Sequence, residues 1–352
     1  MKDFTINFDE LFAEFRPDEK VLSAEPYGEG HINRTYLVCT DDGKYILQQI
    51  NNDVFPNVKE LMENILNVTE FLKSRNAETL NVIKTVRGEA FFEQDGAYFR
   101  VYDFIENTVT YQSADSPEIL EESGYAFGNF QRLLSDFDST LLHETIADFH
   151  NTPKRFVNFE TAAEKDVLSR LDECRAEAEF IISRKDTLRK ITEGIENGSI
   201  PLRVTHNDTK LNNILMDAET NKARAIIDLD TVMPGSMLYD FGDSIRFGTS
   251  TAAEDEKDLD KVHFDIDLYK AYESGFTRAM GDSMTDEERK LLPYSAYLMT
   301  MECGMRFLTD YLQGDTYFKI KYPEHNLVRC RTQLKLAKEM QERFKIFSDV
   351  KK

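Results

Sequence analysis

One segment in the middle of the chain constrains the fold more than any other. Three short apolar runs with the composition of β-strands follow one another closely, at residues 202–205, 214–216 and 224–227. The loop between the first two runs carries His206, Asp208 and Asn213, and the third run leads directly into Asp228. A short hairpin returns the end of a strand to its own loop, so we expect these polar side chains to gather at one end of a small sheet.

The spacing within this segment indicates phosphoryl transfer. Written as H-x-D-x-x-x-x-N, the segment has the pattern of a kinase catalytic loop. The reaction needs a carboxylate that orients and deprotonates the attacking hydroxyl, and oxygen ligands that hold Mg²⁺ on the phosphates of ATP. We therefore predict Asp208 as the base, and Asn213 and Asp228 as ligands of the Mg²⁺ cofactor. His206 is expected to support the loop. An ordinary hairpin with polar turn residues is the alternative.

A second aspartate competes for the metal. The triplet that begins at Asp240 reads D-F-G, the letters of the Mg²⁺-binding motif of protein kinases. It lies beyond a longer segment through Pro234 and Gly235, whereas Asp228 ends an apolar strand. We predict that Asp228 binds the metal and that Asp240 is a local anchor, capping a helix that begins near Ser244.

The order of the expected elements indicates an α+β fold. Residues 21–50 predict three strands, a helix begins near Val58, and residues 90–105 predict another hairpin, giving the order β-β-β-α-β-β of a kinase N-lobe. The remaining sequence predicts mainly helices, over residues 119–134, 159–194, 286–312 and 327–347. We therefore predict a two-lobed, protein-kinase-like fold, with an N-lobe at 1–105 and a C-lobe at 106–352.

The composition excludes several classes of function. A net charge of −21 disfavours nucleic acid as a partner, because phosphate backbones are bound by clustered lysine and arginine. The chain has no run of 18 or more apolar residues and no secretory signal pattern, so no membrane partner is expected. Its 4 cysteines show no C-x-x-C spacing, which favours a reduced, cytoplasmic protein.

Five segments carry a resemblance to a known group of enzymes. They are EPYGEGHIN at 25–33, YILQQ at 45–49, THNDTKLNN at 205–213, DFGDSIRFG at 240–248 and TMECGMRFL at 300–308. The chain resembles the aminoglycoside phosphotransferase and choline kinase superfamily, and more narrowly the N-acetylhexosamine 1-kinases. This implies transfer of phosphate from ATP to the anomeric O1 of N-acetylglucosamine or N-acetylgalactosamine. A kinase of an aminoglycoside or amino alcohol, and a non-catalytic binding module, are the alternatives.

Two regions of the first third are predicted to contact the nucleotide. Gly28 and Gly30 stand where a glycine-rich loop covers phosphates, because glycine lets backbone N–H groups approach an anion closely. A plain hairpin turn is the alternative. Tyr102, Asp103 and Ile105 lie at the inferred hinge between the lobes, where backbone groups and flat side chains would contact adenine.

The third strand departs from the kinase pattern. Kinases carry a lysine there for the α- and β-phosphates, and this chain carries Gln48, whose amide donates a hydrogen bond but brings no charge. We predict that Lys210, two residues after Asp208, supplies the missing cation to the γ-phosphate. A solvated surface lysine is the alternative, and Arg34 is the next candidate for the charge.

The predicted acceptor site contains one unusual cation. Arg306 lies in an apolar helical stretch, where a charge must pair with a carboxylate or meet a ligand. A pair with Glu302, one turn earlier, is the alternative. In a sugar site Arg306 would bond hydroxyl groups and would repel a cationic acceptor, whereas a neutral amino sugar tolerates it. The full predicted set of acceptor residues is His31, Asp208, Asp243, Phe247, Arg306 and Tyr317.

Overall fold

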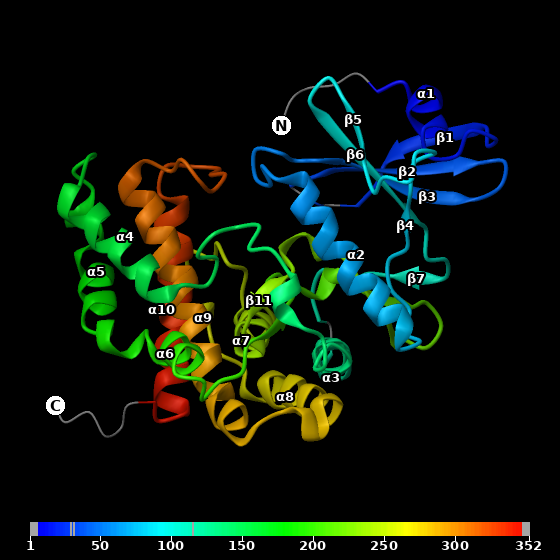
Figure 1. Cartoon of the computed structure of the whole chain (residues 1–352). Coiled ribbons are helices and arrows are strands. Elements are labelled where there is room, and N and C mark those ends of the chain that lie inside the picture. Colours follow the sequence, from blue (N-terminus) through cyan, green and yellow to red (C-terminus); the bar gives the residue numbers. More distant parts are fainter. Residues whose placement is uncertain (1–5, 29, 31, 115, 347–352) are drawn as a thin grey trace. The chain divides into compact units, whose positions relative to one another are not determined.

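The computed structural model describes residues 6–28, 30, 32–114 and 116–346, and it has a β-rich first third followed by a mainly helical remainder (Figure 1). The residues form two compact units. The sheet unit includes the residues up to Val109, together with 136–147 and 215–234. The helical unit includes 110–135, 148–214 and the residues from Gly235 onward. The division into lobes at residue 105 stays a prediction.

The sheet unit is built on an antiparallel sheet of strand order β1-β2-β3-β6-β4, with β5 paired to β6. Its strands are β1 (Val21–Pro26), β2 (Arg34–Thr40), β3 (Lys44–Ile50), β4 (Val82–Ile83), β5 (Phe92–Gln94) and β6 (Ala97–Asp103). Leu47 on β3 and Phe99 and Val101 on β6 are fully buried in its core. The β3–β6 register places Gln48 opposite Arg100, so these two polar side chains lie on the same face of the sheet.

Two helices and a smaller sheet complete the sheet unit. The helices are α1 (Phe8–Ala13) and α2 (Val58–Ser74), and the smaller sheet has the order β10-β9-β7, formed by β7 (Thr108–Val109), β9 (Ile214–Asp217) and β10 (Ala223–Ile226). Helix α2 begins at a cap in which the Asn57 side chain accepts a hydrogen bond from the Glu60 N–H. It buries residues at helical spacing, including Leu61, Ile65 and Val68. The strands expected on either side of the loop at 206–213 are confirmed.

The helical unit contains most of the helices (Figure 1). They are α3 (Pro117–Leu133), α4 (Thr152–Lys165), α5 (Arg175–Ile182), α6 (Lys190–Glu196), α7 (Met237–Gly248), α8 (Ile266–Met280), α9 (Asp286–Gln313) and α10 (His325–Arg343), with the short strand β8 (Arg203–Thr205); β11 (Met233–Gly235) lies where the chain passes between the units. Glycine allows close packing here. A Cβ at Gly242 on α7 would lie 2.4 Å from the backbone oxygen of Ser295 on α9, so the glycine of the D-F-G triplet is required by helix packing.

Two expectations about the elements are wrong, and one long helix was not predicted. The single helix expected over 159–194 is divided into α4, α5 and α6, because Asp166 ends α4 in the left-handed conformation with a φ of 34°. Helix α7 begins at Met237, several residues before Ser244, because Ser236 caps it. Helix α8 was not expected at all. Every helix that the structure describes is too short or too polar to span a lipid bilayer.

Candidate functional site

The loop that carries Asp208 is anchored by the buried carboxylate of Asp240. This carboxylate accepts hydrogen bonds from the backbone N–H groups of His206 and Asn207, both at 2.8 Å, and from the side-chain amide of Gln131 at 2.7 Å. Burial raises the pKa of the Asp240 carboxyl, although the three donors oppose this effect. The backbone before Asp208 is therefore held by two hydrogen bonds to the Asp240 side chain, which the third bond fixes to Gln131.

The predicted anchoring role of Asp240 is confirmed, and its predicted capping role is wrong. Ser236 caps α7, and Asp240 lies inside the first turn of that helix. The helix adds one more bond to the loop, because the hydroxyl of Thr209 donates to the backbone carbonyl of Asp240 at 2.8 Å. His206 also supports the loop as expected: its ring is buried, and its Nδ1 accepts a hydrogen bond from the backbone N–H of Asp208 at 3.2 Å.

Asp208 lies at the centre of a small polar cluster and keeps 25% of its side chain exposed. Its Oδ1 is 2.8 Å from the Nζ of Lys210, and its Oδ2 accepts a hydrogen bond from the Nδ2 of Asn213 at 3.2 Å. The same amide nitrogen donates to the backbone carbonyl of Asp208 at 2.8 Å. Both of these bonds use the side-chain nitrogen of Asn213. Its side-chain oxygen, Oδ1, makes no hydrogen bond with a described residue.

Lys210 is paired with Asp208, in contrast to a solvated surface lysine. Burial lowers the pKa of its ammonium group, but the charge of Asp208 and the hydrogen bond to it outweigh burial, and the pKa is raised. The charge of Asp243 acts in the same direction. Lys210 therefore remains protonated beside the predicted base.

In the sheet unit, Asp228 follows β10 in the left-handed conformation, with a φ of 59°. Asp230, two residues later, forms an ion pair with Arg100 in which the Oδ1 to Nη1 distance is 2.6 Å, and the side chains are 4% and 1% exposed. The other carboxylate oxygen accepts a hydrogen bond from the Nδ2 of Asn33 at 2.6 Å. The turn that carries Asp228 is thus tied to the sheet by a buried charge pair.

Gln48 is part of the same network. Its Oε1 accepts a hydrogen bond from the Nε of Arg100, and its Nε2 donates to the hydroxyl of Thr35, both at 2.9 Å. Burial lowers the pKa of the Arg100 guanidinium. The charge of Asp230, with the hydrogen bond to it and the other neighbouring groups, outweighs burial and raises that pKa, so the guanidinium stays charged. A cation does lie beside the position of the kinase lysine, and it belongs to β6. Our sequence analysis missed Arg100, Asp230 and Asn33, although the β3–β6 register would have placed Arg100 opposite Gln48.

The predicted nucleotide-covering glycines are exposed, and no heavy atom lies within 4 Å of a Cβ built at Gly28 or Gly30. Packing therefore does not require glycine at either position, although Gly28 has a φ of +74°. His31 lies outside the described residues. At the hinge, Tyr102 is 4% exposed, and burial raises its pKa. The carboxylate of Asp103 accepts a hydrogen bond from Asn81 at 2.5 Å.

The backbone of Ile105 offers a hydrogen-bond donor at the predicted hinge. Its carbonyl accepts a hydrogen bond from the hydroxyl of Thr108 at 2.8 Å. Its N–H group makes no hydrogen bond with another described residue. An adenine ring is recognised through groups of this kind, so the geometry leaves one such donor for a ligand.

Arg306 does not pair with Glu302, which was the alternative to a sugar-binding role. The Glu302 carboxylate instead bonds the Nδ1 of His150 at 2.9 Å and the hydroxyl of Thr152 at 2.5 Å. Among the described residues, no carboxylate forms an ion pair with Arg306, whose guanidinium lies 5.8 Å from the ring centre of Tyr317. Tyr317 itself is 70% exposed.

The loop that carries Tyr317 is fixed by the buried carboxylate of Asp310. This carboxylate accepts hydrogen bonds from three consecutive backbone N–H groups, those of Thr316, Tyr317 and Phe318, at 2.8–2.9 Å. Phe318 provides the second ring against Arg306, with 5.5 Å between the guanidinium and the ring centre. Local hydrogen bonds therefore hold both aromatic rings beside the arginine.

Arg155 is a second cation in this region, and our sequence analysis missed it. Burial lowers the pKa of its guanidinium, and the nearby positive charge of Arg306 lowers it further. The Nη2 of Arg155 donates to the backbone carbonyl of Phe149 at 2.9 Å, and no described carboxylate forms an ion pair with the side chain. The helical unit thus holds two neighbouring arginines whose charges are not paired within the described chain.

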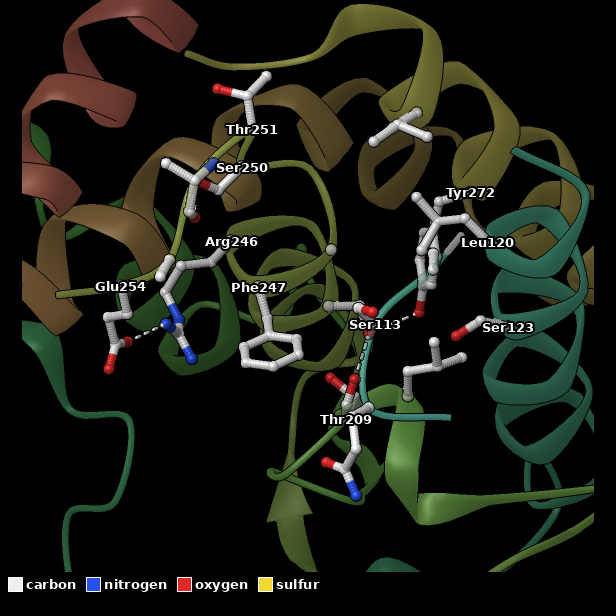
Figure 2. A pocket seen from close by; sticks show the side chains of 18 of the residues that line it. Ser113, Leu120, Ser123, Thr209, Arg246, Phe247, Ser250, Thr251, Glu254 and Tyr272 are labelled. Atoms are coloured by element: carbon white, nitrogen blue, oxygen red, sulfur yellow. Dashed lines mark hydrogen bonds and ion pairs between the residues drawn. The ribbon is translucent and has the colours of Figure 1, made fainter. Parts of the chain in front are cut away.

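Asp243 and Phe247 lie on α7. Within the described part of the chain, neither forms a hydrogen bond, ion pair or ring contact with Arg306. Asp243 pairs with the Nε of Arg246 at 2.9 Å, and Arg246 also reaches Glu254 at 3.0 Å. Burial opposes ionisation of Asp243, but Arg246 outweighs it and lowers the pKa of that carboxyl. The ring of Phe247 is 40% exposed and lines a pocket (Figure 2).

Comparison with known proteins gives the family. Residues 23–275 match the model of the phosphotransferase enzyme family, APH. The chain belongs to this family.

Three solved structures share its fold at low sequence identity. A microcompartment-associated aminopropanol kinase is 13% identical, with a TM-score of 0.64 and 96% of each chain covered. Spectinomycin phosphotransferase, in complex with ADP and spectinomycin, is 14% identical, with a TM-score of 0.59 and 95% of each chain covered. Choline kinase from Cryptosporidium parvum is 15% identical, with a TM-score of 0.57 and coverage of 93% of this chain and 92% of that one. The predicted α+β, aminoglycoside phosphotransferase-like kinase fold is confirmed, and the protein is a phosphotransferase of the APH family.

Proposed function

We propose that this APH-family phosphotransferase transfers the γ-phosphoryl group of ATP to the anomeric O1 of an N-acetylhexosamine, such as N-acetylglucosamine or N-acetylgalactosamine. The resemblance of five sequence segments to N-acetylhexosamine 1-kinases supports the regiochemistry. The unpaired charges of Arg155 and Arg306 support the acceptor class, and this observation carries the proposal.

The acceptor class follows from electrostatics. A cationic acceptor bound beside Arg155 and Arg306 would meet two like charges, and neither arginine forms an ion pair with a described carboxylate. Bringing like charges together in a partly desolvated site costs on the order of several kcal/mol, as it does at protein–protein interfaces. A neutral sugar instead accepts hydrogen bonds from guanidinium groups, and aromatic rings such as Tyr317 and Phe247 cover its apolar face. Asp243 and His31 complete the proposed acceptor residues.

The chemistry is assigned to the loop of the helical unit. Asp208 accepts the proton of the attacking hydroxyl, and the Asn213 amide fixes the rotation of its carboxylate. The anomeric hydroxyl is the most acidic hydroxyl of a sugar ring, so its proton is the easiest of the ring hydroxyl protons for a carboxylate to accept. Lys210 holds the other carboxylate oxygen in the resting protein and turns its ammonium group to the γ-phosphate when ATP binds.

Mg²⁺ fits the donors that the chain supplies. The described residues contain no group of three or more His, Cys, Asp and Glu side chains arranged to bind a metal, so a protein-only cage is not available in that part of the chain. The Oδ1 of Asn213 is unbonded, and together with the carboxylate of Asp228 it offers the hard oxygen ligands that Mg²⁺ accepts alongside phosphate oxygens. When bound, Mg²⁺ neutralises charge on the transferring phosphoryl group.

The nucleotide is placed by the sheet unit. The Ile105 N–H is the proposed donor to adenine, with Tyr102 and Asp103 beside it, and Gly28 and Gly30 cover the phosphates. Gln48 contributes to the nucleotide site indirectly, because its Oε1 accepts a hydrogen bond from Arg100 and so holds that cation. The four cysteines form no disulfide, which supports the proposed cytoplasmic location.

An acceptor screen tests the function. Purified protein is incubated with ATP and Mg²⁺ and with neutral hexoses, N-acetylhexosamines, aminoglycosides or amino alcohols, and ADP release is measured. We expect turnover of N-acetylhexosamines, and phosphorus NMR of the product should show coupling to the anomeric proton. Coupling to the C6 protons would refute the regiochemistry. Turnover confined to cationic acceptors would refute the acceptor class, and absence of turnover would support a binding module.

A matched pair of variants connects the result to the arginines. Arg306→Gln should raise KM for N-acetylglucosamine and reduce the discrimination against cationic acceptors. Arg289→Gln, on the same helix α9 but outside the described site, should change neither. If Arg306→Gln leaves the ratio of kcat/KM values for neutral and cationic acceptors unchanged, the electrostatic argument is wrong.

A further inference from the structure

Apart from Phe247, which is also a proposed acceptor residue, the residues that line a pocket on the helical unit have no role in the function proposed above. Its volume is about 330 Å³, near the lower end of the size of small-molecule sites. Its walls come from α3, α7, α8, α10 and the segment 250–254, and Figure 2 shows Arg246 and Glu254 on one side and Leu120, Ser123 and Tyr272 on the other.

Two polar groups in the walls have no partner among the described residues. Gln333 on α10 is 2% exposed, its Oε1 is buried without a hydrogen bond, and its side chain bonds no other described residue. Ser123 on α3 is also 2% exposed, and its hydroxyl makes no hydrogen bond with a described residue. Buried polar groups in folded proteins are almost always bonded. The Gln333 oxygen is an exception, and with the Ser123 hydroxyl in the walls of the same cavity it points to a ligand that bonds both.

The charge of the pocket favours a neutral ligand. Arg246 and Glu254 are the only charged residues among the described lining residues, and they pair with each other at 3.0 Å. Arg246 also pairs with Asp243, so its charge is balanced and offers an anion no net attraction. One nitrogen of its guanidinium, Nη2, is not used in either pair and remains a donor.

The remaining walls have the chemistry of a carbohydrate site. The Phe247 ring, which is 40% exposed, and Leu120 and Leu268 provide apolar surface for the C–H face of a ring. Ser123, Gln333 and Arg246 provide hydroxyl, amide and guanidinium groups for its hydroxyls. A pocket with an aromatic ring, a few convergent polar groups and no net charge fits a neutral, polyhydroxylated ring.

We propose that this pocket is a second carbohydrate subsite, which takes a neutral sugar ring other than the one that carries the reacting hydroxyl. The inference rests on the proposed function only in treating the acceptor as a sugar. The ring is either the non-reacting residue of a disaccharide acceptor or a separate sugar molecule.

The pocket borders the catalytic loop, because two residues of that loop form part of its walls. Thr209, the residue between Asp208 and Lys210, lines it, and so does Leu211. The backbone carbonyl of Thr209 accepts a hydrogen bond from Ser244 at 3.0 Å, and Ser244 in turn accepts one from the hydroxyl of Tyr272 at 2.7 Å. A sugar in the pocket therefore contacts the loop that positions the base, so its occupancy should affect KM or affinity for the acceptor.

The test removes the unpartnered groups one at a time. Gln333→Leu keeps the side-chain volume and removes the amide, and Ser123→Ala removes the hydroxyl. Gln341→Leu makes the same change on the same helix α10, outside the pocket, and serves as the control. Because neither Gln333 nor Ser123 has a bond to lose, both variants should unfold thermally at or above the temperature of the unchanged protein. This separates loss of binding from loss of folding.

Binding and turnover are measured with N-acetylglucosamine, with its β-1,4-linked disaccharide and with glucose. If the ring belongs to a disaccharide acceptor, both variants should raise KM for the disaccharide by about ten-fold, the effect of one lost hydrogen bond, and leave KM for the monosaccharide unchanged. If the ring is a separate molecule, calorimetry should detect a second monosaccharide binding event that the variants abolish.

Other outcomes separate the two proposals. Unchanged KM values and unchanged calorimetric isotherms for all three sugars in both pocket variants would overturn the subsite. A protein that phosphorylates none of these sugars would refute the proposed function, yet a calorimetric signal that Gln333→Leu removes and Gln341→Leu retains would still support the pocket.

Discussion

The buried ion pair between Arg100 and Asp230 should make a large contribution to the stability of the sheet unit. The pair has a distance of 2.6 Å, and its side chains are 1% and 4% exposed. Replacing Arg100 with methionine keeps most of the side-chain length and removes the charge. Asp230 then remains buried with the Asn33 amide as its hydrogen-bond partner, and Gln48 loses its bond to the guanidinium.

The expected cost follows from the burial of both partners. Removal of one member of a buried pair leaves an uncompensated charge and typically costs about 3–5 kcal/mol. An exposed pair in the same unit provides the scale for comparison. Arg75 and Asp136 are 3.0 Å apart, with side chains 44% and 73% exposed, and Arg75→Met should cost about 1 kcal/mol or less. Arg100→Met should therefore destabilise the protein at least three times as much as Arg75→Met.

Unfolding in guanidinium chloride measures the difference in stability between the Arg100→Met and Arg75→Met variants. The chain has no tryptophan, so far-UV circular dichroism is the suitable signal. The double variant Arg100→Met with Asp230→Asn leaves no unpaired charge, and we expect it to cost less than the sum of the single variants by about 1–3 kcal/mol, the range of coupling between residues in contact. Equal losses for Arg100→Met and Arg75→Met, or additive losses in the double variant, would refute the reasoning.

Four further predictions concern the site. Asp208→Asn should lower kcat by about 10²–10⁴-fold, measured as ADP release, with ATP affinity retained. Asp228→Ala should weaken Mg²⁺-dependent nucleotide binding in calorimetry and leave the unfolding midpoint nearly unchanged, whereas Asp240→Ala should lower that midpoint because three hydrogen bonds are lost. Lys210→Met should lower kcat in the same assay, and a kinetically silent variant would show that the phosphate charge comes from elsewhere. Glu302→Gln should flatten the acid limb of a plot of unfolding temperature against pH. Burial opposes ionisation of Glu302, but its histidine partner outweighs it and lowers the pKa below the ordinary 4.5. Stability from this group is therefore present above about pH 4.5 and is lost as the pH falls through the lowered pKa.

Local patterns predicted the strands near the loop better than the helices. The runs at 202–227 have β-type residues and fixed turns, so their positions were readable from the sequence. Residues 159–194 have helical periodicity on both sides of Asp166, and nothing in that pattern marks the left-handed residue that ends α4. Helical propensity continues through such a break, because the break depends on how the flanking helices pack.

The groups that the sequence did not reveal are those whose partners are distant in the chain. Arg100 and Asp230 are joined by strand register and by the turn after β10, and neither can be read without the sheet. Arg155 lies on α4, before the helix expected over 159–194, and its neighbour Arg306 lies far along the chain on α9. Glu302, the alternative partner of Arg306, instead bonds His150 in the segment before α4.

In the proposed function, the placement of positive charge is what lets an acidic protein reject cationic acceptors. A net charge of −21 attracts cations at long range, but at physiological ionic strength this attraction is screened over about 8 Å. Within that distance of Arg306 the acceptor meets the charge of Arg155, and these two side chains have no described carboxylate as an ion-pair partner. In the proposed function the local field decides which acceptor stays, and the overall charge affects only how often acceptors arrive. At position 48 of β3 an amide stands where kinases carry a lysine, so we propose that positive charge acts on the phosphate through Lys210 and on the acceptor through the arginine pair.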